Sequence, residues 1–246
     1  MRKVFLSALA LVLAGAAMAQ TNTTSVTSPN TPSVRVSSLP RGNDHIMLQL
    51  GYLSWTGKPD SINTGGLPRT FNMYVMFAFP FKTNPHFSSA IGLGFGSDNM
   101  YFDNTYVDLK STAAKLPFSN VADTNHYKKF KVNTAYLEVP VELRFTSNPD
   151  DDSKSIKAAI GVKAGLLLSA HSKGKDLQNK NGTIINSYTE KESSKRFFNS
   201  NRLSVTARVG IGHFSLFGSY AVTPLLKDGV GPVIRPMTIG LNVSGL

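Results

Sequence analysis

The sequence of 246 residues contains no cysteine, a single tryptophan and few charged residues. The absence of cysteine excludes a disulfide scaffold, a thiolate zinc site, a cysteine nucleophile and a lipid-modified N-terminal cysteine. Charged residues make up 17% of the chain, whereas a soluble domain usually carries about a quarter. Apolar residues at 41% and aromatic residues at 10% exclude a disordered chain, which needs few aromatics and a high charge density.

Long hydrophobic runs are also scarce, and the longest lies at the N-terminus. Two basic residues precede an apolar stretch at residues 4–15, and an A-x-A site follows at residues 17–19. This order predicts a signal peptide over residues 1–19, cleaved between Ala19 and Gln20, and an exported protein. A transmembrane anchor is less favoured because the apolar stretch is shorter than the roughly 20 residues that a spanning helix needs.

Residues 20–43 are dominated by Ser, Thr, Asn and Pro. Such a segment buries too little apolar surface to offset the entropy of ordering it. We therefore predict a disordered periplasmic tail that acts as a spacer, with peptidoglycan or protein binding as the less favoured alternative. The remaining residues, 44–246, are predicted to form one domain.

This domain contains eight segments in which apolar side chains alternate with small or polar ones. The segments lie at residues 46–52, 71–81, 87–96, 136–145, 156–169, 202–211, 214–223 and 237–244. Alternation with period two indicates β-strands with one apolar face, and by itself it also fits a soluble sandwich. The segments run for about 9–11 residues, which is the length that a tilted strand needs to cross a bilayer.

The connections between the segments alternate in length. Short connections lie at residues 82–86, 146–154 and 210–213, and long ones lie at residues 55–69, 97–130, 170–200 and 224–235. Short periplasmic turns that alternate with long external loops are typical of outer-membrane barrels. The sequence therefore predicts an all-β fold: an eight-stranded antiparallel transmembrane β-barrel, built as an up-and-down meander. The connection at residues 97–130 is long enough for another hairpin, so ten strands remain an alternative.

Aromatic residues gather at both ends of the predicted strands, as expected for girdles at the two membrane interfaces. The predicted periplasmic girdle contains Phe79, Phe81, Phe87, Phe145 and Phe214, and the outer one contains Tyr52, Phe71, Phe95 and Tyr220.

One strand carries a more specific pattern. The stretch from Ala135 to Arg144, with its Tyr-Leu-Glu-Val-Pro core, resembles a strand of the outer-membrane β-barrel domain family of porin-like and PorT-like proteins. The glycine-rich segment at residues 87–96 and the closing stretch from Pro236 to Asn242 resemble the same family, so the resemblance covers residues 44–246. It implies a single small barrel in the outer membrane, without a known activity, and PorT-like relatives imply a role in secretion.

Charged residues on the inward parity of the strands are expected to meet in the barrel interior. They are Glu138, Glu142, Arg144, Lys157, Lys163, Arg202 and Arg208. An eight-stranded barrel is just wide enough for side chains to fill it, and an unpaired charge inside is strongly disfavoured. We therefore predict a lumen charge network that plugs the barrel and fixes the register, in preference to a proton or ion path.

Basic residues gather in the predicted external loops. Lys128, Lys129 and Lys131 form one cluster, and the flexible segment from His171 to Ser200 carries six basic against three acidic residues. Basic clusters at the outer rim can bind lipopolysaccharide phosphates by charge pairing, although a solvated loop with ordinary counter-ions is the simpler interpretation. The predicted partners are outer-membrane lipid, lipopolysaccharide and envelope proteins, with no nucleic acid.

The residues provide no pattern for catalysis. The five histidines lack metal-ligand spacing, and no acidic residue accompanies His213-Phe214-Ser215 to orient a catalytic histidine. The sequence therefore predicts no enzyme activity, cofactor or metal. The favoured function is an outer-membrane barrel of structural or interaction type that presents basic external loops. The alternatives are a subunit of a secretion or transport complex and a small-solute channel.

Overall fold

The computed structural model describes residues 46–149, 151 and 154–245. The predicted signal peptide at residues 1–19, its cleavage site between Ala19 and Gln20, and the predicted tail at residues 20–43 lie outside the described residues.

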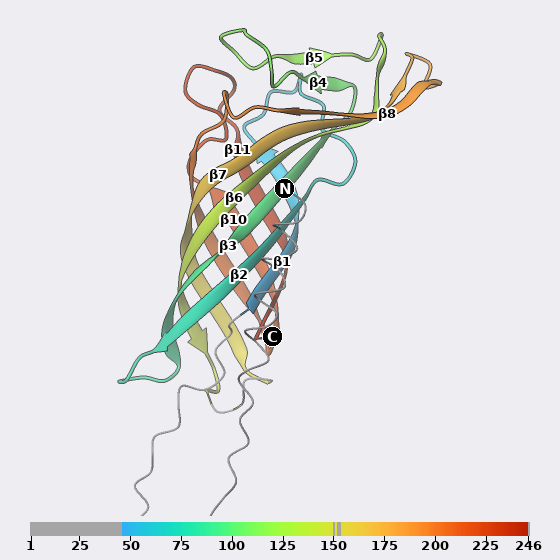
Figure 1. The fold of residues 1–246 in the computed structure, drawn as a ribbon. Helices are drawn as coiled ribbons and strands as arrows, with labels where there is room; N and C mark the ends of the chain where they lie inside the picture. Colours follow the sequence, from blue (N-terminus) through green and yellow to red (C-terminus); the bar gives the residue numbers. More distant parts are fainter. Residues whose placement is uncertain (1–45, 150, 152–153, 246) are drawn as a thin grey trace, which may run out of the picture. The chain divides into compact units, whose positions relative to one another are not determined.

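The described residues form a closed ring of antiparallel β-strands. The strands are β1 (Ile46–Thr56), β2 (Arg69–Pro80), β3 (Phe87–Phe102), β4 (Thr105–Val107), β5 (Phe118–Asn120), β6 (His126–Thr146), β7 (Ile156–Gln178), β8 (Ile184–Ser193), β9 (Asn201–Ile211), β10 (Phe214–Ala221) and β11 (Arg235–Ser244). Eight of them follow one another around the ring in the order β6, β3, β2, β1, β11, β10, β9 and β7, and pairing of β6 with β7 closes it. The predicted eight-stranded antiparallel barrel is confirmed (Figure 1).

The other three strands lie outside the ring, at one of its ends (Figure 1). β4 pairs with β5 in a separate two-stranded sheet, and β8 pairs with the C-terminal part of β7. The connection at residues 97–130 therefore holds a hairpin, as the ten-strand alternative supposed. The hairpin does not join the ring, so the barrel keeps eight strands.

The connections alternate in length as predicted. Short turns at residues 81–86, 147–155 and 212–213 join β2 to β3, β6 to β7 and β9 to β10. Gly212 adopts a φ of 59° in the last of these, a conformation that only glycine reaches without steric cost. The long connections all lie at the opposite end, which we call the cap end of the barrel.

The outward face of the ring is apolar between its two ends. Large side chains such as Phe77, Leu93, Val141 and Leu216 are all exposed on it. A soluble monomer rarely exposes a contiguous apolar surface larger than a few hundred Å². This surface therefore fits lipid rather than water, which removes the soluble-sandwich alternative. No helix long and apolar enough to span a membrane occurs within the described part of the chain.

Strands β3 and β6 are longer than the alternation predicted, because their apolar side chains change faces near the cap end. β3 continues to Phe102 and β6 begins at His126. In these extensions Met100, Phe102, Phe130 and Val132 are buried on the inward face. The sequence criterion looked for apolar residues on the outward parity, and it stopped where that parity becomes polar.

The segment at residues 170–200, predicted as a flexible loop, is largely a hairpin. β7 runs to Gln178, and β8 returns antiparallel to it with His171 opposite Ser193. A bulge in β7 leaves Leu168 without a partner, because Ala135 pairs with Ser169 and Tyr136 pairs with Leu167. The bulge inverts the parity of β7, so its polar residues continue the outward face of β6.

Candidate functional site

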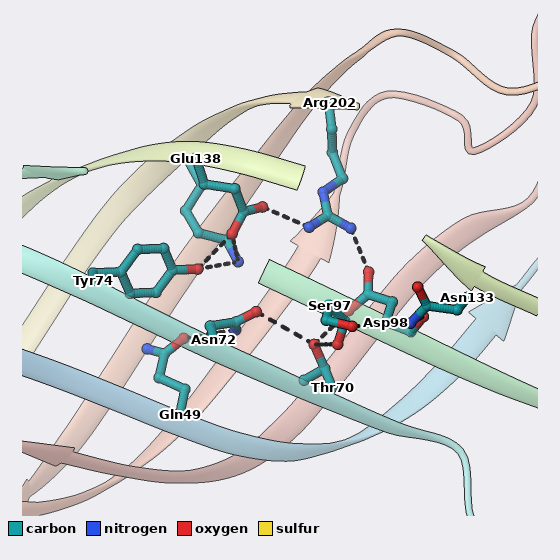
Figure 2. A network of polar contacts seen from close by, with 10 residues as sticks. Gln49, Thr70, Asn72, Tyr74, Ser97, Asp98, Asn133, Glu138 and Arg202 are labelled. Atoms are coloured by element: carbon teal, nitrogen blue, oxygen red, sulfur yellow. Dashed lines mark hydrogen bonds and ion pairs between the residues drawn. The ribbon is translucent and has the colours of Figure 1, made fainter. Parts of the chain in front are cut away.

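Glu138 lies at the centre of a buried charge cluster in the lumen (Figure 2). Strand β6 directs this carboxylate inward, where Oε1 accepts a hydrogen bond from Arg202 Nη2 of β9 at 2.5 Å. Oε2 accepts hydrogen bonds from Tyr74 Oη of β2 at 2.5 Å and from Lys163 Nζ of β7 at 3.3 Å. One side chain therefore ties together four strands from around the ring.

Arg202 extends this cluster to a second carboxylate. Its Nη1 donates to Asp98 of β3, and its Cζ lies 3.7 Å from the centre of the Tyr136 ring. Asp98 also accepts a hydrogen bond from Thr70. Figure 2 shows the amide and hydroxyl side chains that continue this polar network: Gln49, Asn72, Ser97 and Asn133.

A second charge cluster surrounds Glu142, four residues along β6 toward the short-turn end. Its Oε2 accepts hydrogen bonds from Arg144 Nε at 2.8 Å and from Arg208 Nη2 at 3.1 Å. Lys157 of β7 is buried in the lumen as well. All seven residues of the predicted lumen network are thus buried. Among the described residues, six of them form ion pairs around Glu138 or around Glu142.

The sequence analysis missed two members of the charge cluster around Glu138. Asp98 has the inward parity of β3, but it falls in the segment that was assigned to a loop. Tyr74 has the inward parity of β2, but its hydroxyl is not part of the predicted charge network. Both residues follow from inward parity once the full length of the strands is known.

Two cavities lie beside Asp98, between the Glu138 cluster and the cap end, and both are very small. The cavity beside Arg202 and Asp98 has a volume of about 10 Å³, and the cavity between Trp55 and Leu225 has a volume of about 0 Å³. A single buried water needs roughly 10–15 Å³. Neither cavity has room for a solute.

A hydrophobic core closes the cap end of the barrel, and we call it the cap core. It consists of Leu53, Trp55, Ile62, Met100, Phe102, Val107, Leu109, Leu116, Phe130, Val132, Tyr136, Leu167, Ala170, Phe197, Phe198, Leu225, Leu226 and Ile234. Ile62, Leu109, Phe198 and Leu225 come from the four long connections in turn. The connections therefore pack on one another above the lumen as a folded cap.

The cap contains a recess of about 260 Å³ beside the β4–β5 hairpin. Tyr106, Tyr127 and Phe130 line it, and the Phe130 ring centre lies 5.1 Å from that of Tyr106 and 6.1 Å from that of Tyr127. Burial and then the Glu192 carboxylate raise the pKa of Tyr106 to about 12. Burial and then a hydrogen bond to Glu190 raise the pKa of Tyr127. Both phenols therefore stay protonated and donate to these carboxylates.

The predicted lipopolysaccharide contacts lie at the start of β6. Lys128, Lys129 and Lys131 are all accessible, Lys131 less so than the other two. Lys129 and Lys131 share the parity that faces outward, while Lys128 has the other parity, because successive side chains in a strand point to opposite faces. The structure therefore places two of the three lysines on one surface.

The described residues offer little for catalysis. They contain no group of three or more His, Asp or Glu side chains that could hold a metal ion. His213 lies in the short turn before β10, and its Nδ1 is 3.0 Å from the carbonyl oxygen of Ser244. The imidazole is therefore held by the backbone of β11 at the short-turn end.

The ring, its apolar outward face and its filled lumen define a closed eight-stranded transmembrane β-barrel. The chain matches the family described as outer membrane protein beta-barrel domain over residues 34–225, and it belongs to this family. Membership assigns the barrel to the outer membrane.

Comparison with other proteins adds little to this assignment. No curated protein sequence matches the chain. Ail, the attachment invasion locus protein of Yersinia pestis, is 15% identical, both in complex with the heparin analogue sucrose octasulfate and alone; the match covers 81% of this chain and 94% or 95% of Ail, with TM-scores of 0.34 and 0.33. A mutant porin of Rh. blastica is 6% identical over 81% of this chain and 98% of the porin, with a TM-score of 0.20. Scores this low assign neither a partner nor an activity.

Proposed function

We propose that this protein is an outer-membrane interaction protein without enzyme activity, in which a closed barrel anchors a folded external cap. The observation that carries the proposal is the cap core, to which all four long connections contribute. Beneath it, the two cavities beside Asp98 are too small for a solute. A channel needs an open path through the barrel. A protein that binds a partner instead benefits from a binding surface whose structure is fixed before binding. Ordering the surface in advance lowers the entropy that a partner has to offset on binding.

The small-solute channel makes the clearest contrary prediction. We expect the folded protein to be silent in a planar bilayer, because the ion pairs of Glu138 and Glu142 occupy the lumen beneath the cap. Folding is checked in the same sample by its shifted mobility on a gel without heating. Single-channel steps that change when either glutamate is made neutral would replace our proposal with the channel.

The secretion or transport subunit is the second alternative, and it needs a separate test. We expect the tagged protein, taken from native membranes in mild detergent, to be recovered alone or with lipopolysaccharide. A stoichiometric set of envelope proteins, together with retention of exported substrates in a strain that lacks the protein, would instead favour the secretion complex. Normal export in that strain is the result expected for a self-contained barrel.

A further inference from the structure

The outward surface of the cap carries a row of lysines that crosses three strands. Lys131 of β6 lies directly opposite Lys173 of β7, which lies directly opposite Lys191 of β8. Lys129 and Lys175 form a second pair beside this row. Residues that pair directly in a sheet share a face, and like charges in such positions repel. These five residues, which we call the lysine ladder, therefore crowd positive charge on one face at some cost in stability.

The acidic residues that alternate with this ladder point elsewhere. Glu190 and Glu192 flank Lys191 in β8, but their carboxylates accept hydrogen bonds from Tyr127 and Tyr106 of the cap. Among the described residues, only one carboxylate lies within ion-pair distance of the ladder: that of Asp176, 3.9 Å from Lys175 Nζ. The ladder is thus a surface of concentrated positive charge with almost no internal counter-ion.

His171 lies within this surface and responds to its charge. It pairs with Asn133 on one side and with Ser193 on the other. The charged groups that act on it are Lys191, Lys131 and Lys173, from all three strands of the row, and none is acidic. Burial and then these lysines lower its pKa to about 4. Its Nδ1 is buried and has no hydrogen-bond partner among the described residues.

The position of the ladder relative to the lipid face indicates what approaches it. The outward parity of β6 is unbroken from Phe145 to Lys129, so the lysines lie on the same side of the strand as Val139 and Val141. Lys131 follows the last large apolar residue on this face, Leu137, by six positions, which is roughly 20 Å along the strand. With a strand tilt of about 35–45°, the ladder faces the saccharide and phosphate layer above the outer leaflet.

We propose that the lysine ladder, with His171 in the row beside it, is a docking surface for the phosphate groups of lipopolysaccharide in the surrounding outer leaflet. The proposal rests on the proposed function, because it identifies the partner of the external surface of a closed barrel. Phosphates that bridge neighbouring lysines of the ladder would relieve the repulsion between these lysines. Charge pairing with phosphate is the interaction that clustered lysines provide at a membrane surface.

The test compares two variants with the same change in net charge. Changing Lys131, Lys173 and Lys191 to Gln removes the central row, whereas changing Lys82, Lys115 and Lys180 to Gln removes three exposed lysines elsewhere. Binding of purified lipopolysaccharide to the folded full chain is measured in detergent. We expect the ladder variant to bind about a hundredfold more weakly, at roughly a fivefold loss for each lysine, and the control variant to bind within about twofold of the original protein.

Two further comparisons use a single change or none. Lys129→Gln is expected to weaken binding, and Lys128→Gln, one residue away on the other parity, is not. With the unmodified protein, dephosphorylated lipopolysaccharide is expected to bind poorly, and phosphorylated lipopolysaccharide is expected to raise the pKa of His171 toward its ordinary value in an NMR titration. These comparisons stand even if the triple variant fails to fold.

The contrary results are equally specific. Equal losses in the ladder and control variants would assign binding to overall charge and overturn the proposal. Equal binding of dephosphorylated lipopolysaccharide, or of vesicles of anionic phospholipid, would overturn the choice of lipopolysaccharide phosphate. None of these results concerns conduction or protein partners, so the docking surface can fail while the closed interaction barrel stands.

Discussion

Glu138 illustrates, at the scale of one residue, how a charge can be buried in this barrel. Its carboxylate meets Arg202, Lys163 and Tyr74 at hydrogen-bond distance, so every donor around it contributes to holding the negative charge. The glycine at position 96 leaves the space that this requires, since a Cβ there would lie 2.7 Å from Glu138 Oε2. The side chain is therefore matched to its surroundings in both charge and volume.

Neutralising this carboxylate is expected to destabilise the barrel strongly. Glu138→Gln leaves Arg202 and Lys163 buried without their shared counter-ion, and losing one partner of a buried ion pair costs about 3–5 kcal/mol. Tyr74→Phe removes one hydrogen bond from the same carboxylate and should cost about 1 kcal/mol. Urea unfolding in detergent measures both values. Similar losses in the two variants would show that the charge pairing contributes little.

The lowered pKa of His171 predicts how the free energy of unfolding depends on pH when no ligand is bound. Its pKa is lowered from 6.5 to about 4 in the folded protein, so the unfolded chain binds more protons between these two values. The contribution of His171 to the free energy of unfolding is therefore largest above pH 6.5. It decreases as the pH falls toward 4 and changes no further below that pH. His171→Asn should flatten the unfolding free energy in that window. An NMR titration that gave an ordinary pKa would contradict the prediction.

At the scale of the strand, the sequence predicted the membrane part of the barrel well and the cap poorly. Inside the bilayer, apolar side chains must point outward, so alternation revealed eight strands and seven buried charges. Beyond the bilayer, β3 and β6 keep the period of two while Met100 and Phe130 turn the apolar face inward. A search for apolar residues on the outward face ends where a strand leaves the lipid and enters water. For this reason, the sequence analysis missed Asp98 and the pairing of Lys173 with Lys131.

The point at which a strand leaves the lipid can be tested by placing a lysine at either of two positions on the outward face of one strand. Val205 and Asn201 share the exposed outward parity of β9, four residues apart. Val205→Lys places a charge within the apolar band and should cost about 2–4 kcal/mol, whereas Asn201→Lys at its margin should cost about 0–1 kcal/mol. Refolding into lipid vesicles followed by urea titration measures both costs. Equal costs would mean that the lipid boundary does not lie between these positions.

At the scale of the whole molecule, the cap core and the lumen network make one continuous interior. Tyr136 belongs to the cap core and also lies beneath the Arg202 guanidinium, so the two parts meet at that ring. Trp55, the single tryptophan, lies in the cap core and reports its unfolding. We therefore expect the cap and the barrel to unfold together, although the cap is built from connections that the sequence presented as loops.

Phe198 provides the test of this coupling. It is fully buried in the connection between β8 and β9, and it pairs with Leu226 of the connection between β10 and β11. Phe198→Ala should lower the free energy of unfolding of the whole barrel by about 3–5 kcal/mol. Leu67→Ala, at an exposed position of another long connection, should have little effect.

Two readouts separate a coupled cap from an independent one. Trp55 fluorescence follows the cap, and mobility on an unheated gel follows the ring of strands. Coincident transitions that both move in Phe198→Ala are expected for a single cooperative unit. If fluorescence changed at lower urea while the gel mobility stayed as in the original protein, the cap would be a separate unit. The fixed external surface that the proposed function requires would then depend on partners rather than on the barrel beneath it.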